Sequence, residues 1–281
     1  MTASNGCSTG EKEEKQSLNM LILKAFSAVG RAVINWVDTL GSATIFLFFA
    51  LWKTFRRRQL SKVINQIYYI GARSTGIIML ISLFTGMVLG LQSYHALTTF
   101  GAEGAVGTLV ALSLIREMGP VLSAIMITAR AGSAIAAEIG IQRISEQIDA
   151  LHTMRIDPLR HIVSPRVAAA IISFPLLTTV FDLVGMVGGY ISSVLLLGLN
   201  HGVYINSIQA SVDLKDITDG LIKSVVFAVI VVTVCCYQGY FAHMRKDSHG
   251  AKAVGMATTS AVVISCVLIL VSDYVVTSLL I

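Results

Sequence analysis

The chain has 281 residues, of which 54% are hydrophobic and only 13% carry a charged side chain. Soluble domains usually carry about 25% charged residues, so this composition excludes an ordinary soluble domain and indicates an integral membrane protein. The net charge of +5 comes from lysines and arginines that gather beside apolar stretches, where they act as topology signals. We therefore expect no nucleic acid among its partners. The four cysteines follow no disulfide or zinc spacing, which predicts core thiols and no metal site.

The segment before the first basic block predicts a tail and an interfacial region. Residues 1–16 are polar with mixed charges and predict a disordered tail. Residues 17–62 predict an amphipathic elbow, because apolar residues recur every three or four positions between Leu18 and Leu40, as in a helix lying in the membrane interface. Residues 43–52 are apolar but number only about ten, half of what a span needs. We expect them to dip into the membrane; a full crossing would give six spans.

Residues 63–281 predict an all-α membrane domain, since a helix satisfies its own backbone in lipid. Five apolar stretches are long enough to cross a bilayer, near residues 68–97, 105–137, 167–199, 217–241 and 253–281. With five crossings, every strongly basic segment falls on the same side, which the positive-inside rule assigns to the cytoplasm. The amino terminus is then cytoplasmic and the carboxyl terminus lies outside.

The second span carries two opposite charges, Arg116 and Glu117, just before Gly119 and Pro120. Each charge costs about 2.5 to 3.5 kcal/mol at the bilayer centre, so both should face a partner or a cavity. Pro120 cannot donate to the carbonyl of Arg116, which predicts a polar break in the helix. Adjacent residues do not share a helix face, so each charge needs its own partner, and Lys223 is a candidate for Glu117. Substrate contact and helix packing stay open as equal alternatives.

Other residues within the spans favour a structural role. Asp182 and Asp273 are lone carboxylates in apolar stretches. Two GxxxG pairs, Gly86 with Gly90 and Gly185 with Gly189, give weak support for a dimer, because small residues are also common inside any helix bundle.

The segment from Ser145 to Met154 lies between the second and third spans and predicts a short amphipathic helix. Ile148, Leu151 and Met154 recur at a spacing of three, and Asp157-Pro158 then marks a turn. A short helix across the cytoplasmic face can take up motion from an ATPase, or it can be an ordinary connector.

Several motifs in this central region carry a family resemblance. They are Arg116-Glu117-x-Gly119-Pro120, Ala129-Arg130-x-Gly132-Ser133-Ala134, Ala137-Glu138-Ile139-Gly140, Glu146-Gln147-Ile148-Asp149-Ala150-Leu151 and Asp157-Pro158 through Ser164-Pro165-Arg166. Together they resemble the MlaE/YrbE permeases, the membrane subunits of ABC systems that move phospholipids in Gram-negative envelopes. The resemblance implies a homodimer in the inner membrane, with an interfacial amino-terminal helix, five spans per subunit and a short cytoplasmic coupling helix. It also implies a cytoplasmic ABC ATPase, a periplasmic ring of MCE-domain proteins and a small cytoplasmic accessory protein as partners.

The resemblance also implies two sets of site residues. The phospholipid-binding cavity would be lined by Leu89, Ala96, Leu97, Phe100, Arg116, Glu117 and Lys223. The coupling helix would dock on the ATPase through Glu146, Gln147, Ile148, Asp149, Ala150, Leu151 and Met154. This chain departs from many relatives at Arg155, where a glycine is frequent, which bears on the turn geometry there.

The predicted function is therefore that of an ABC permease that moves phospholipids between the inner and outer membranes and maintains outer-membrane lipid asymmetry. The chain contains no G-x-x-x-x-G-K-[ST] motif, so we expect it not to be an enzyme and to bind no cofactor, with ATP and magnesium held by the partner ATPase. The alternative is an ion-coupled secondary carrier that uses Glu117, Asp182 and Asp273. A lipid-modifying enzyme is disfavoured, because neither HExxH nor GxSxG occurs.

Overall fold

The computed structural model describes residue 41 and residues 60–244 and 250–280. The chain divides into two compact units, Met1–Leu47 and Phe48–Ile281, and all the helices described below belong to the second. The predicted disordered tail, the amphipathic helix within 18–40 and the stretch 43–52 lie outside the described residues.

Five helical segments are long and apolar enough to cross a membrane, and the described residues contain no strand. The five segments are Ser61–Thr98, Glu103–Ile144, Leu159–Leu196, Leu214–Tyr240 and Ala251–Leu280. The all-α class and the five predicted spans are thereby confirmed. The first two segments extend beyond both predicted limits, because polar residues continue the helices at their ends. The third begins earlier than predicted, at Leu159, and ends at Leu196, before its predicted limit of 199.

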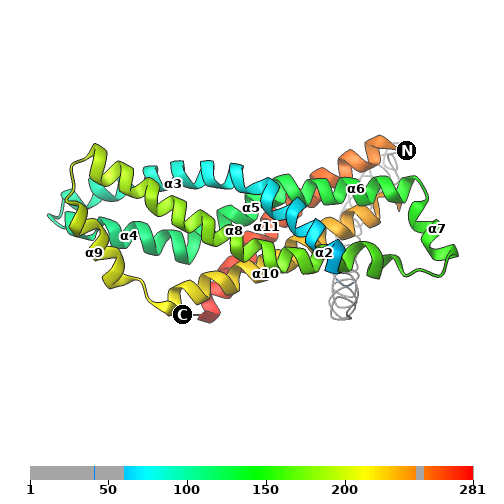
Figure 1. Cartoon of the computed structure of the whole chain (residues 1–281). Helices are drawn as coiled ribbons and strands as arrows, with labels where there is room; N and C mark the ends of the chain where they lie inside the picture. The colour runs from blue at the N-terminus through cyan, green and yellow to red at the C-terminus, as the bar shows by residue number, and fades with distance from the viewer. Residues whose placement is uncertain (1–40, 42–59, 245–249, 281) are drawn as a thin grey trace, which may run out of the picture. The chain divides into compact units, whose positions relative to one another are not determined.

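The first three spans are built from several helical pieces, while the last two are single helices (Figure 1). The first contains α2 (Leu60–Ile67), η1 (Tyr68–Ala72) and α3 (Arg73–Thr98). The second contains η2 (Glu103–Ala105), α4 (Val106–Ser113), η3 (Leu114–Met118), α5 (Gly119–Ile127), η4 (Thr128–Gly132) and α6 (Ser133–Ile144). The third contains η5 (Leu159–Val163), α8 (Ser164–Tyr190) and η6 (Ile191–Leu196). The fourth is α10 (Leu214–Tyr240) and the fifth α11 (Ala251–Leu280).

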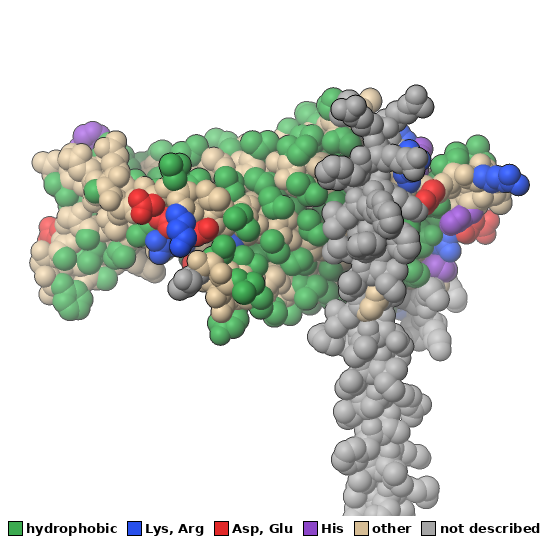
Figure 2. Space-filling model, turned by 90° about the horizontal axis from the view of Figure 1, so that it is seen from below, with side chains coloured by type: hydrophobic (Ala, Val, Ile, Leu, Met, Phe, Trp, Pro, Cys, Tyr) green, Lys and Arg blue, Asp and Glu red, His purple; other side chains and the backbone are tan. Residues whose placement is uncertain are grey.

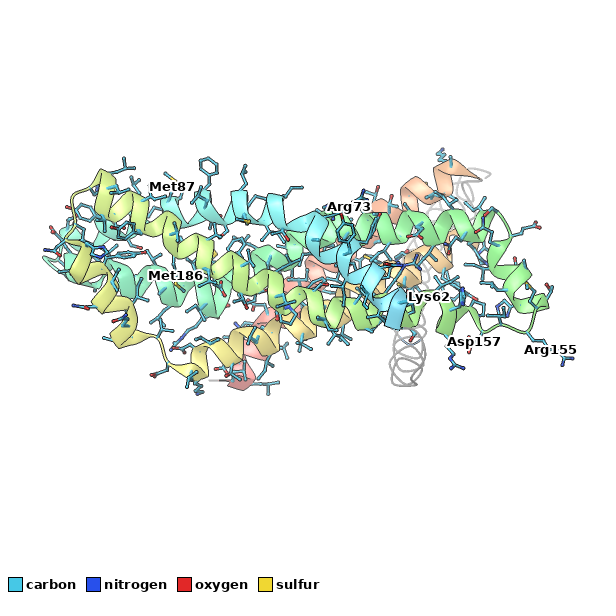
Figure 3. All side chains as sticks on the ribbon, viewed as in Figure 1. Lys62, Arg73, Met87, Arg155, Asp157 and Met186 are labelled. Carbon is cyan, nitrogen blue, oxygen red and sulfur yellow. The ribbon has the colours of Figure 1, made fainter. Side chains whose placement is uncertain are left out.

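Connecting helices mark the two ends of this bundle. At one end lie α9 (His201–Ser211) and the turn that follows α3; at the other lie α7 (Gln147–Thr153) and η7 (Ala242–Met244) (Figure 1). Lys62, Arg155 and Asp157 lie toward the α7 end, whereas Met87 and Met186 lie toward the α9 end (Figure 3). The α7 end is called the basic end below, because it also carries Arg143.

Small residues bring α3 and α8 into close contact. A Cβ placed on Gly86 would lie 1.9 Å from the Gly185 carbonyl oxygen, and one on Gly90 would lie 2.9 Å from that of Gly189. The Ser82 hydroxyl also donates a hydrogen bond to the Phe181 carbonyl across the same contact. The two GxxxG pairs therefore face each other inside one chain, where close backbone approach favours packing in lipid. Because both pairs pack within the subunit, they give no support for the dimer, which stays a prediction.

The outer surface of the bundle is largely apolar, as expected for helices in lipid. Figure 2 shows hydrophobic side chains over most of one face, with a group of acidic and basic side chains part-way along it. Exposed apolar residues include Leu80 and Phe84 on α3, Leu176 on α8, and Val267 on α11. The chain is thus a multi-pass membrane protein, and the charged group within its length is the feature to explain.

Candidate functional site

The second span changes from α- to π-helical winding at the predicted polar break. Residues Leu114–Met118 form the π-helical η3. The Gly119 N–H donates to the Leu114 carbonyl, five residues back, whereas in an α-helix it would donate to the Ile115 carbonyl. Pro120 has no N–H to offer Arg116, and the Lys223 ammonium takes that role by donating to the Arg116 carbonyl at 2.7 Å. The predicted break is confirmed, and a cation from the fourth span satisfies it.

Lys223 joins three spans through an ion network. Its Nζ lies 3.0 Å from Oε1 of Glu117 on η3 and 3.3 Å from Oδ1 of Asp273 on α11. The Lys223 side chain is only 4% exposed, so its charge depends on these two carboxylates. Thr277, one turn beyond Asp273, donates a longer hydrogen bond of 3.5 Å to Glu117. The suggested pairing of Glu117 with Lys223 is confirmed, and Asp273 is a member of the network rather than a lone carboxylate.

Arg116 has a separate partner, as its position next to Glu117 requires. Its Nε and Nη2 donate to Oδ1 of Asp216 at 2.9 and 2.8 Å. Asp216 lies in the first turn of α10 and is held there because its Oδ2 accepts a hydrogen bond of 3.3 Å from the Asp213 N–H. The Arg116 side chain is 57% exposed while that of Asp216 is 7% exposed. The guanidinium is thus oriented from one side and open on the other.

These charged residues surround a cavity of about 510 Å³. Its lining residues come from the start of α10, the end of α11 and the second span, and the start of α10 and the end of α11 lie at the same place in Figure 1. The lining consists of Leu112, Ser113, Arg116, Glu117, Asp213, Lys215, Asp216, Asp219, Lys223, Thr277 and Leu280. It therefore holds three basic and four acidic side chains. Such a lining can bind a group that carries both signs of charge, and its two leucines continue into the apolar surface.

Close contacts fix the backbone around this cavity. A Cβ on Gly220 of α10 would lie 2.7 Å from the Ile115 carbonyl oxygen, so only glycine lets α10 approach η3 this closely. A Cβ on Gly119 would lie 1.8 Å from Oδ1 of Asp182 on α8. That oxygen is buried and has no hydrogen-bond partner among the described residues. Asp182 therefore lies behind the π-helical segment, and its side chain lies outside the cavity lining.

The structure brings together only part of the predicted lipid-binding set. Arg116, Glu117 and Lys223 line one cavity. The remaining four residues lie outside that lining, near the far end of the first span: Leu89, Ala96 and Leu97 on α3, and Phe100 in the turn that follows it. Phe100 is 84% exposed. The contact of these residues with lipid stays a prediction.

The sequence analysis missed Asp216 and Thr277 and treated Asp273 as a lone carboxylate. Asp216 could have been found, because it lies seven residues before Lys223 and therefore on the same face of one helix. The contacts of Asp273 and Thr277 depend on how α11 packs on α10, which has no local signal in the sequence.

The predicted coupling helix is the short helix α7, and most of its residues remain accessible at the basic end. Ile148 is fully buried, while Met154, just after the helix, is 68% exposed. Asp149 forms an ion pair with Arg143 on α6, with 2.5 Å between Oδ1 and Nη1. This contact holds α7 against its own subunit. Arg143 also donates to His243 at 3.1 Å and lies 5.4 Å from the centre of the Tyr240 ring. Docking of this helix on an ATPase stays a prediction.

Two residues around α7 adopt left-handed backbone conformations. Glu146, before the helix, has a φ of 58°, and Arg155, after it, has a φ of 57°. A glycine takes this conformation without strain, so Arg155 occupies a position that favours glycine.

This fold and site define a polytopic helical membrane protein with an ion network inside its spans. The chain matches the permease MlaE family over residues 63–279, and it belongs to that family. It is 41% identical over 260 residues to a probable ABC transporter permease protein of Rickettsia felis, across 92% of this chain and 98% of that one. It is 40% identical over 262 residues to the intermembrane phospholipid transport system permease protein MlaE of Haemophilus influenzae, with shares of 92% and 98%.

A more distant similarity reaches into plants. Over 215 residues the chain is 35% identical to the protein TRIGALACTOSYLDIACYLGLYCEROL 1, chloroplastic, of Arabidopsis thaliana, across 76% of this chain and 60% of that one. The chain is accordingly an ABC-type permease of the MlaE family.

Proposed function

We propose that this permease moves phospholipids between the inner and outer membranes of a Gram-negative cell and so maintains outer-membrane lipid asymmetry. The observation that carries the proposal is the cavity of about 510 Å³ with three basic and four acidic side chains, set among apolar spans. A phospholipid headgroup combines a phosphate with a cationic or hydroxyl group, and its acyl chains fit an apolar surround. The name of the Haemophilus influenzae relative, which describes phospholipid transport, supports the same substrate class.

Arg116 is the residue best suited to a headgroup phosphate. Its guanidinium is oriented by Asp216 and 57% exposed, and a planar guanidinium binds phosphate through paired hydrogen bonds. Lys223 has a different role, since its buried ammonium donates to the Arg116 carbonyl and to Glu117 and forms an ion pair with Asp273. We therefore assign Arg116 to the lipid and Lys223 to the architecture of the cavity.

The energy source in this proposal is a separate cytoplasmic ABC ATPase that binds ATP and magnesium and docks on α7. Two copies of the permease would carry two such ATPases, with a periplasmic ring of MCE-domain proteins above them and a small accessory protein below. The exposed positions Gln147, Ala150 and Met154 share one face of α7 and its continuation. Asp149 is less suited to docking, because it is already paired with Arg143.

An ion-coupled carrier is the rival function. Of its three proposed carboxylates, Glu117 and Asp273 both pair with Lys223. Of these three carboxylates, Asp182 is the one without an ion pair among the described residues, and its buried Oδ1 has no hydrogen-bond partner there. A single such carboxylate is a poor basis for an ion path across the bundle.

Purification of the tagged full-length chain from its native membrane tests the proposal. Mass spectrometry of the sample should find an ABC ATPase, an MCE-domain protein and bound phospholipid. The double variant Ala150→Lys, Met154→Glu should lose the ATPase, whereas Lys252→Glu at the same end should keep it. Recovery of the chain without an ATPase, together with ion-driven uptake in vesicles, would support the carrier instead.

A further inference from the structure

A second polar cavity lies at the basic end of the bundle, apart from the charged cavity described above. It has a volume of about 240 Å³ and forms where α2, α6, η5 and α8 meet. Lys62 marks its position in Figure 3, toward the α7 end. The polar side chains that line it are Lys62, Asn65, Gln66, Gln142, His161 and Arg166. One water occupies about 30 Å³ of liquid, so the space admits a larger polar group.

Arg166 gives this cavity a buried cation with an unused donor. Its side chain is only 4% exposed. Nη1 donates to the Ile162 carbonyl at 3.0 Å, and Nη2 lies 2.9 Å from Oε2 of Glu138. Nε is buried and has no hydrogen-bond partner among the described residues. A buried donor without a partner is destabilising, so a ligand that accepts a hydrogen bond from Nε would be favoured here.

Further groups around the cavity suit a phosphate and the polar atoms next to it. The Lys62 ammonium, at the exposed mouth, lies 3.1 and 3.0 Å from the two ring nitrogens of His161. The Oε1 atoms of Gln66 and Gln142 are buried, and neither has a hydrogen-bond partner within the described part of the chain. The cations can donate to phosphate oxygens, while the amide oxygens can accept from a hydroxyl or ammonium beside the phosphate.

Charge also favours an anion in this cavity. Glu138 neutralises Arg166 through Nη2, which leaves the charge of Lys62 without a carboxylate among the six polar residues of the lining. Lys62 and Arg166 come from the ends of the first and third spans. This is the depth at which lipid headgroups lie beside a transmembrane helix.

We propose that Lys62, His161 and Arg166 form a phosphate-binding site at the basic end, separate from the Arg116 cavity. Its ligand is a phosphate group, either of a membrane phospholipid or free in solution. The site does not depend on the proposed transport function, because a headgroup held between the first and third spans could anchor the permease whatever it moves.

Binding to the purified full-length chain in a neutral detergent tests this proposal. The probes are inorganic phosphate, dihexanoylphosphatidylglycerol, and dihexanoylglycerol as a phosphate-free control, with thermal stability as the readout. Lys62→Glu should weaken the binding of phosphate-bearing probes by at least about tenfold, since it removes one charge-assisted donor and adds a like charge. Lys62→Gln, which is less disruptive, should weaken it in the same direction.

Two matched controls keep the outcomes distinct. Arg160→Glu changes an exposed cation at the same end that lies outside this lining, and Arg116→Gln removes the cation from the other cavity; both should retain binding that depends on Lys62. Stabilisation by phosphatidylglycerol alone identifies a lipid headgroup, and stabilisation by inorganic phosphate as well identifies a site for the free anion too. Equal losses in Lys62→Glu and Arg160→Glu, or no response to either phosphate-bearing probe, would overturn the proposal.

Discussion

Replacing Lys223 by methionine should destabilise the folded permease strongly, because this side chain satisfies groups from two other spans. Its Nζ lies 3.0 Å from Glu117, 3.3 Å from Asp273 and 2.7 Å from the Arg116 carbonyl, with 4% of the side chain exposed. Removing one partner of a buried ion pair costs about 3 to 5 kcal/mol, since the remaining charge is left uncompensated. Because Glu117 is 46% exposed, water can partly solvate its charge once Lys223 is removed. We therefore expect a loss at the low end of that range, about 3 kcal/mol in the free energy of unfolding.

The assay is unfolding in mixed micelles of dodecyl maltoside and sodium dodecyl sulfate, followed by circular dichroism. Lys215→Met is the matched control, since Lys215 lines the same cavity on the same helix but is exposed; it should change the free energy by less than about 0.5 kcal/mol. Adding Glu117→Gln to Lys223→Met should recover part of the loss, with a coupling of about 1 to 3 kcal/mol. Equal effects of Lys223→Met and Lys215→Met would refute the ion network as a source of stability.

Three further predictions concern packing, backbone strain and the coupling helix. Gly86→Ala should destabilise by about 1 to 3 kcal/mol, because its Cβ would overlap the opposing backbone, whereas Gly76→Ala, with open space around it, should not; a shared response in the micelle assay would contradict this contact. Arg155→Gly should raise the free energy of unfolding by up to about 1 kcal/mol and so raise the melting temperature, because glycine adopts a φ of 57° without strain. A fall in the melting temperature would count against this expectation. Arg143→Ala should speed hydrogen exchange in α7 by removing its ion pair and its His243 contact, while Arg160→Ala should leave exchange there unchanged.

Much of the fold followed from the sequence, because the bilayer restricts what an apolar stretch can form. The five spans came from the length of the apolar runs, and the break at Pro120 came from the missing N–H. The π-helical winding of η3 was not predictable, since an extra residue in a turn depends on which neighbouring group donates a hydrogen bond to the carbonyl left free, here the Lys223 ammonium. The GxxxG pairs show a second limit: the sequence marks a helix as able to approach another closely, but not which helix it meets.

The charged site was predicted in part for the same reasons. Arg116, Glu117 and Lys223 stood out because charges in apolar spans are costly. Their arrangement with Asp273 depends on the packing of α11 against α10, which residue spacing does not encode. Asp149 shows what residue spacing leaves out: this acidic residue on the predicted docking helix pairs with Arg143 in its own subunit, while its contact with an ATPase stays a prediction.

If this permease moves phospholipid through the Arg116 cavity with energy from a partner ATPase, lipid transfer should require both ATP and Arg116. The most direct measurement is ATP-dependent transfer of radiolabelled phospholipid between vesicles by the complex purified from native membranes. The wild-type complex should transfer lipid only with ATP, and Arg116→Gln should slow transfer at least about tenfold, as expected for loss of a charge-assisted contact, while the ATPase stays bound. Transfer driven by an ion gradient without ATP would show that the protein is a secondary carrier, and an Arg116→Gln complex that works at the wild-type rate would show that Arg116 does not bind the transported lipid.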